Sequence, residues 1–191
     1  PAAAQRRRRG AALACPPFLS TANSQLSREP GNHSNPETPP GTPSAMAALM
    51  RAGADESTRE GAIEANIATS RILASPKYPT SETDRRAMAE QAHDRCNCPG
   101  GRIRQRAAII KSGNRIPLLQ TIAVPSQVIH GIDDPLLNIA GGRDTADNIA
   151  GADFHAISGM GHETPAALSP VLADLIGCFA CRVDGAGMER S

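Results

Sequence analysis

The sequence predicts an α/β fold. Residues 45–119 have the composition of consecutive helices. Two short apolar segments follow, one beginning near Val124 and one near Phe154, and each runs into a tight turn. We expect helices over 142–149 and 164–179, so that strand and helix alternate through the C-terminal third of the chain. The second helix is expected to face the sheet with Leu168, Val171, Leu172, Leu175 and Ile176.

Composition narrows the class of protein. The chain has 191 residues, enough for one domain, and is 40% hydrophobic but only 2% aromatic. A core built mostly of Ala, Ile and Leu is therefore expected. The net charge of +1 gives no indication of a nucleic-acid partner. No uninterrupted apolar run reaches the roughly 18 residues of a membrane span, so no membrane partner is expected. An odd count of 5 cysteines favours reduced thiols and a cytoplasmic location.

Residues 1–44 are expected to form a disordered or altered N-terminal segment. Arg6–Arg9 precede an apolar stretch that Pro16 and Pro17 interrupt, which is a poor secretion signal. The arginines could contact an acidic surface or nucleic acid, or could simply be a solvated end. From Ser27 to Ser44 the chain is rich in Pro, Gly, Asn, Ser and Thr, a composition typical of loops.

The helical stretch has recognisable starts and stops. The helices are expected at 45–51, 58–73, 82–95 and 102–112. Ser57-x-x-Glu60 has the pattern of a capping box, and Ser81 is placed to cap the next helix. Pro99-Gly100-Gly101 is expected to break the chain, and Gly113 suits the position after the last helix. The inward faces are expected to carry Ile63, Ile67, Leu73, Ala87, Met88, Ala92, Ile103, Ala107 and Ile110.

The chemistry lies in the two strand-to-turn segments. The first is Val124-Pro125-Ser126-Gln127-Val128-Ile129-His130-Gly131-Ile132-Asp133-Asp134-Pro135-Leu136, and its turn presents an acid. The second is Phe154-His155-Ala156-Ile157-Ser158-Gly159-Met160-Gly161-His162, and its turn presents a histidine. A carboxylate that orients an imidazole supplies two of the three members of a hydrolytic triad.

These two segments resemble the C-terminal part of the α/β-hydrolase fold, most closely its bacterial esterase and lactonase-like branch. The resemblance implies that Asp134 is the triad acid after the seventh strand and that His162 is the base after the eighth. It gives Asp133 and His130 structural roles. It also implies a helical lid over 45–119, the C-terminal part of the hydrolase core over 120–182, and a tail over 183–191. In this family the triad order is Ser, acid, His, so the serine should lie upstream.

The nucleophile is absent from these 191 residues. They contain no Gly-x-Ser-x-Gly and no His-Gly-Gly oxyanion segment. A complete α/β-hydrolase needs roughly 250 residues or more, and the sequence given starts at Pro1. We therefore interpret it as a C-terminal fragment or a truncated product with an altered start. On its own it is predicted to lack hydrolase activity and to leave one side of its sheet open.

The implied function is hydrolysis of a small-molecule ester, lactone or similar carbonyl compound, with no metal or organic cofactor. One alternative is a non-catalytic module that binds a partner or complements a separate N-terminal half. Another is a thiolate metal site, because zinc favours such ligands. Its candidate ligands are Cys96, Cys98, Cys178, Cys181 and the nearby His93. The wide separation of the two cysteine pairs speaks against it, and Cys178 is instead expected to pack in the last helix.

Overall fold

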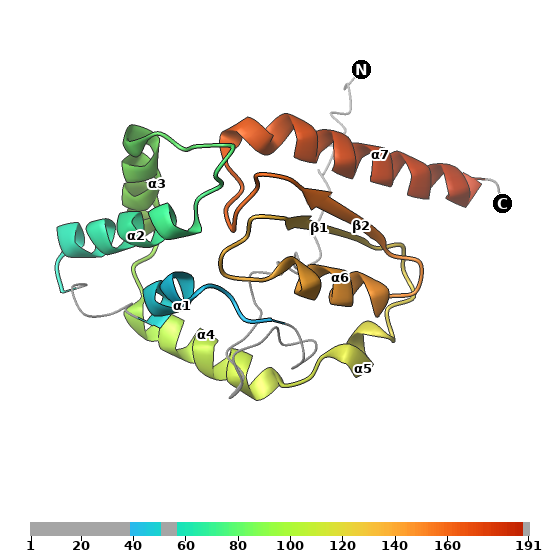
Figure 1. Ribbon diagram of the computed structural model, residues 1–191, viewed down its shortest axis with the longest axis horizontal. Helices are drawn as coiled ribbons and strands as arrows, with labels where there is room; N and C mark the ends of the chain where they lie inside the picture. Colours follow the sequence, from blue (N-terminus) through green and yellow to red (C-terminus); the bar gives the residue numbers. More distant parts are fainter. Residues whose placement is uncertain (1–38, 51–56, 189–191) are drawn as a thin grey trace, which may run out of the picture.

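The computed structural model describes residues 39–50 and 57–188, and Figure 1 shows their arrangement. The helices are α1 (Pro43–Met50), α2 (Arg59–Leu73), α3 (Glu82–Arg95), α4 (Pro99–Ser112), α5 (Ile116–Leu119), α6 (Ile139–Asp147) and α7 (Ser169–Met188), with a 3-10 turn, η2 (Ala166–Leu168), before α7. The strands are β1 (Gln127–Gly131) and β2 (Asp153–Ile157).

The two strands form a parallel sheet. Gln127 aligns with Asp153 at one end, and Gly131 aligns with Ile157 at the other. Helix α6 makes the crossover between the strands, as parallel pairing requires. Helices α6 and α7 lie on opposite sides of the sheet, giving a helix–sheet–helix arrangement (Figure 1). The α/β class predicted from the sequence is therefore present.

Helix α7 packs on the sheet through part of its predicted face. Leu168, just before the helix, is fully buried with Ile157 and Met160, and Leu172 and Leu175 pack against this cluster. The prediction was wrong for Val171 and Ile176, which are 44% and 46% exposed. It was also wrong for Cys178, whose thiol is exposed. The helix leaves these side chains uncovered because no described segment packs over them.

Helices α2 and α3 pack against each other at the other end of the molecule (Figure 1). Ile63, Ile67 and Ala89 make its buried centre. The predicted inward face of α3 was wrong: Met88 is 60% exposed, and Ala87 and Ala92 are also exposed. The buried positions of α3 are Arg85 and Ala89 instead. An arginine thus occupies an inward position where an apolar side chain was expected.

Several element boundaries differ from those predicted. The cap of α2 is Thr58 rather than Ser57, and its hydroxyl accepts a hydrogen bond from the Gly61 amide. Pro99 does not break the chain but opens α4, where a proline without an amide proton is tolerated in the first turn. Gly113 follows α4 with a φ of 59°, as its predicted position requires.

The C-terminal helices also differ in extent. Asn138 caps α6, which therefore starts at Ile139, before the predicted Gly142. Helix α7 continues to Met188, beyond the predicted helix end at residue 179. The short helix α5, with a proline in its first turn, was not predicted.

Helix α1 rests on the turn that follows β1. Ala45 is fully buried against Leu136 and Leu137. The Thr42 amide donates a hydrogen bond to the Pro135 carbonyl at 2.7 Å. The segment before α1 thus supports the acid-bearing turn, although nearly a hundred residues separate them in sequence.

Some sequence predictions concern residues outside those described. They include the predicted disorder of residues 1–38, the arginine run 6–9, and the side chains of Ile103 and Ile110.

Within the described part, one helical stretch, Ala166–Gly185, is long and apolar enough to cross a membrane by length and composition. It is not an uninterrupted apolar run, because charged residues such as Asp174 lie within it. Only 6% of the stretch is buried, and its length and composition alone do not make it a membrane span.

Candidate active site

Asp134 lies in the turn directly after β1. Its Oδ1 accepts hydrogen bonds from the backbone amides of Leu136 and Leu137, both at 2.8 Å. Hydrogen bonds from amides to an ionised carboxylate are among the stronger ones in proteins. One oxygen thus anchors the side chain within its own turn, and Oδ2 is left to face the second turn.

His162 lies in the turn after β2, and two glycines let this turn form. Gly159 has a φ of 81°, a conformation that favours glycine. A Cβ at Gly161 would lie 2.4 Å from the Ala74 carbonyl oxygen, so only glycine fits there. The His162 amide donates to the Leu73 carbonyl at 3.0 Å. The histidine turn therefore rests on the segment that links α2 to α3.

The structure brings the two sequence-predicted residues together. His162 Nδ1 lies 2.8 Å from Asp134 Oδ2, and the side chains are 14% and 6% exposed, respectively. A carboxylate only accepts, so the contact places the proton on Nδ1 and leaves Nε2 with its lone pair in the neutral ring. An imidazole held in this way can take a proton at Nε2 and return it.

Asp133 points to a different partner from its neighbour. Its Oδ2 accepts a hydrogen bond from the Gly159 amide at 2.6 Å, and its own amide donates to the Met160 carbonyl at 3.1 Å. These contacts tie the two turns together. Asp133 thus holds the shape that lets Asp134 reach the imidazole.

His130, at the end of β1, is buried beneath the site. Its Nε2 donates to the Leu137 carbonyl at 3.0 Å and lies 3.8 Å from Asp134 Oδ2. A Cβ at Gly142 would lie within 2.6 Å of this ring, so glycine lets α6 approach it. The buried His130 ring therefore supports the turn that carries Asp134.

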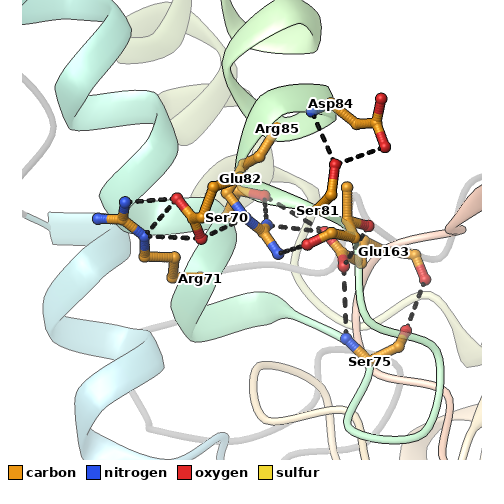
Figure 2. A network of polar contacts seen from close by, with 9 residues as sticks. Ser70, Arg71, Ser75, Ser81, Glu82, Asp84, Arg85 and Glu163 are labelled. Carbon is orange, nitrogen blue, oxygen red and sulfur yellow. Dashed lines mark hydrogen bonds and ion pairs between the residues drawn. The ribbon is translucent and has the colours of Figure 1, made fainter.

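Sequence reasoning missed the polar cluster beside His162. Glu163 follows the histidine, and its side chain turns towards Ser70, Ser75 and Arg85 (Figure 2). Arg85 is a buried cation on α3. A charged residue at a helix position that periodicity assigns to the core would have been the signal for this cluster.

The thiolate metal site predicted as an alternative is not assembled. Cys96, Cys98, Cys178 and Cys181 are all exposed and free. Among the described residues, no group of three or more His, Cys, Asp or Glu side chains is arranged to hold a metal ion.

Comparison with known proteins identifies the class of fold. No protein-family model matches the sequence, and no curated protein matches it. Among solved structures, the esterase EaEST from Exiguobacterium antarcticum is 14% identical, with a TM-score of 0.55 over 82% of this chain and 53% of that one. The esterase RhEst1 from Rhodococcus sp. ECU1013 is 21% identical, with a TM-score of 0.50 over 73% of this chain and 48% of that one.

These similarities define the class of fold. The chain has part of the α/β-hydrolase fold, as the sequence predicted, and its structural neighbours are bacterial esterases. It spans about half the length of these esterases.

Proposed function

We propose that residues 120–182 carry the acid and base of a serine hydrolase that acts on small-molecule esters, lactones or similar carbonyl compounds. The observation that carries the proposal is the 2.8 Å contact between Asp134 Oδ2 and His162 Nδ1. Both residues follow the carboxyl ends of adjacent parallel strands, which is where α/β folds gather their functional side chains.

Each side chain has a defined task in this chemistry. A serine hydroxyl attacks the substrate carbonyl carbon while His162 Nε2 takes its proton. The tetrahedral intermediate then collapses, and Nε2 gives that proton to the departing alkoxide, which leaves as an alcohol. In the second half, His162 deprotonates a water that attacks the acyl-serine, and Nε2 returns this proton to the serine oxygen as the acyl C–O bond breaks and the acid is released. Asp134 stabilises the imidazolium each time it forms, and the amides of Leu136 and Leu137 hold the carboxylate in place.

The serine and the oxyanion donors lie outside these 191 residues in this proposal. Residues 1–191 alone are therefore expected to give no serine-dependent turnover. We assign residues 45–119 as the lid, because the end of α2 at Leu73 and Ser75 just after this helix contact the histidine turn. A lid that contacts this turn can exclude water and select the substrate.

The coding DNA upstream of the codon for Pro1, read in all three frames, is the first test. The longest product that joins a Gly-x-Ser-x-Gly segment to residues 1–191 should hydrolyse nitrophenyl esters. His162→Gln should then lower kcat by a factor on the order of 10⁶, and Asp134→Asn by roughly 10⁴, as in other triads. His155→Gln, on β2, and Asp147→Asn, on the surface of α6, are matched controls expected to retain activity.

Other outcomes decide against the proposal. An active product whose kcat is insensitive to His162→Gln and Asp134→Asn would exclude these residues as base and acid. If no upstream nucleophile is found, co-purification with a separate serine-bearing chain would favour the complementation alternative. Ester turnover by residues 1–191 alone, abolished by His162→Ala, would contradict the expected inactivity.

A further inference from the structure

The residues on both sides of His162 are held by one serine. Ser75 lies in the segment between α2 and α3 and is almost completely buried. Its hydroxyl accepts a hydrogen bond from the Gly161 amide at 2.9 Å and donates to the Glu163 carbonyl at 3.4 Å. The His162 amide donates to the carbonyl of Leu73, the last residue of α2. The backbone of the histidine is thus fixed before, at and after its own position.

The Glu163 side chain adds a second attachment. Its Oε1 lies 3.4 Å from both the Ser75 amide and the Thr80 hydroxyl. Its Oε2 lies 3.3 Å from the Ser70 hydroxyl and 3.4 Å from Arg85 Nη1. Figure 2 shows this carboxylate lying between the arginine and Ser75. The contacts are long individually, but they converge on one carboxylate from three parts of the helical segment.

Arg85 determines which way the Glu163 side chain points. Its side chain is 5% exposed, whereas the nearby Glu82 is 62% exposed and its contact with Arg85 is 3.6 Å. Glu163, at 20% exposure, is therefore the more buried counter-charge. Arg85 also donates to Ser70, which in turn donates to Glu163. A buried cation without a counter-charge is costly, so Arg85 holds the Glu163 side chain towards α3 and away from the imidazole.

We propose that Ser75, Glu163 and Arg85 are positioning residues that set the place of His162 from helices α2 and α3. The inference rests on the proposed function for its catalytic meaning, since it makes the lid a support for the base as well as a cover. The Asp134 contact fixes one end of the imidazole, and the Ser75 and Glu163 contacts fix the backbone from which the ring projects. Without them, the Nδ1 contact would form only part of the time.

The hydrogen-bonded Nδ1 proton of His162 directly reports how much of the time the contact with Asp134 is formed. In the isotope-labelled full chain, its NMR signal is assigned by its loss in His162→Gln. Ser75→Ala should broaden this signal and make its exchange with water roughly tenfold faster, as local opening does. Ser81→Ala is the matched control: Ser81 lies in the same connecting region and caps α3 through the Asp84 amide at 3.1 Å. It should lower stability, as loss of a cap does, and leave the Nδ1 signal unchanged.

A second variant keeps the test decisive. If Ser75→Ala does not fold by circular dichroism, Glu163→Gln is read instead, and it should speed the same exchange. An Nδ1 signal that is unchanged in the readable variants would overturn the proposal. The measurement needs no catalysis, so it stands whether or not the hydrolase function is confirmed. In an active longer product, Ser75→Ala should lower kcat roughly 10- to 100-fold with KM little changed, the size expected from a misplaced catalytic group.

Discussion

His162 and Glu163 are consecutive residues whose side chains contact two different parts of the molecule. His162 turns towards the β1 turn and meets Asp134 at 2.8 Å. Glu163 turns towards helices α2 and α3 and meets Arg85 and Ser70. One contact belongs to a local motif of strands and turns, and the other belongs to packing between distant segments.

The two contacts differ in what holds them. The Asp134 side is built from short hydrogen bonds within two turns that the sheet brings together. The Glu163 side is built from longer contacts that depend on α3 keeping Arg85 buried. The base of the candidate site therefore depends on the C-terminal core for its chemistry and on the helical segment for its position.

The largest effect is expected from removing the charge of Glu163, which disrupts its contacts with helices α2 and α3. Glu163→Leu leaves Arg85 buried without its most buried counter-charge, so it should destabilise the chain by about 3–5 kcal/mol. Arg85→Met combined with Glu163→Leu should recover most of that loss, because neither charge then remains unpaired. Urea unfolding of the two single variants and the double variant measures the coupling.

The exposed pair of Arg59 and Asp94 is the matched control for this cycle. Their contacts are 2.9 and 2.7 Å, but both side chains are about half exposed. Asp94→Leu should therefore destabilise the chain much less than Glu163→Leu. Equal costs for Glu163→Leu and Asp94→Leu would show that Arg85 does not need Glu163 as a counter-charge.

The two turns that carry Asp134 and His162 were predictable from the sequence. Asp before Pro135, and glycines at 159 and 161, mark tight turns after short apolar strands, and turn chemistry is local. Strand order then places the two turns at the same edge of the sheet. The positions of Asp134 and His162 therefore followed from the motif, and the structure adds the contact between them.

The Glu163 side was not predictable by the same route. Arg85 and Glu163 are 78 residues apart, and no local pattern pairs them. The periodicity of α3 assigned Met88 inward because only apolar residues were counted, whereas the buried position is held by an arginine with a partner on another segment. The start of α4 at Pro99 was missed for a local reason, because a proline is tolerated in the first turn of a helix and does not break it there.

The turn that joins the two sides can be tested with two glycines. Gly151 and Gly159 both have positive φ, 72° and 81°. A Cβ at Gly151 meets nothing within 4 Å, whereas one at Gly159 would lie 2.4 Å from Lys77 side-chain atoms. Gly151→Ala should cost about 1–2 kcal/mol from backbone conformation alone. Gly159→Ala should cost about 1–3 kcal/mol more, because Lys77 must move.

Thermal unfolding of the two alanine variants gives this difference. It also reports whether the histidine turn is packed against the segment after α2 in solution, where the Lys77 amide donates to the Gly159 carbonyl at 3.2 Å. Equal melting temperatures for the two variants would mean that this packing does not persist. The contacts from Asp133 and Asp134 would then have to hold the turn without this packing.

The smallest expected effect is at the exposed rim of the Arg85 cluster. The hydrogen bond from Arg71 is the main cause that lowers the pKa of Glu82 below its ordinary value of 4.5, and the charges of Arg71 and Arg85 act in the same direction. A carboxyl whose pKa is lower in the folded chain stabilises it fully above the ordinary pKa, and this stability is lost as pH falls through the folded value. The melting temperature of the native chain should therefore exceed that of Glu82→Gln near neutral pH, and the gap should narrow as the pH falls below the ordinary value of 4.5. A gap that stays constant across this range would show that Glu82 acts through packing rather than charge.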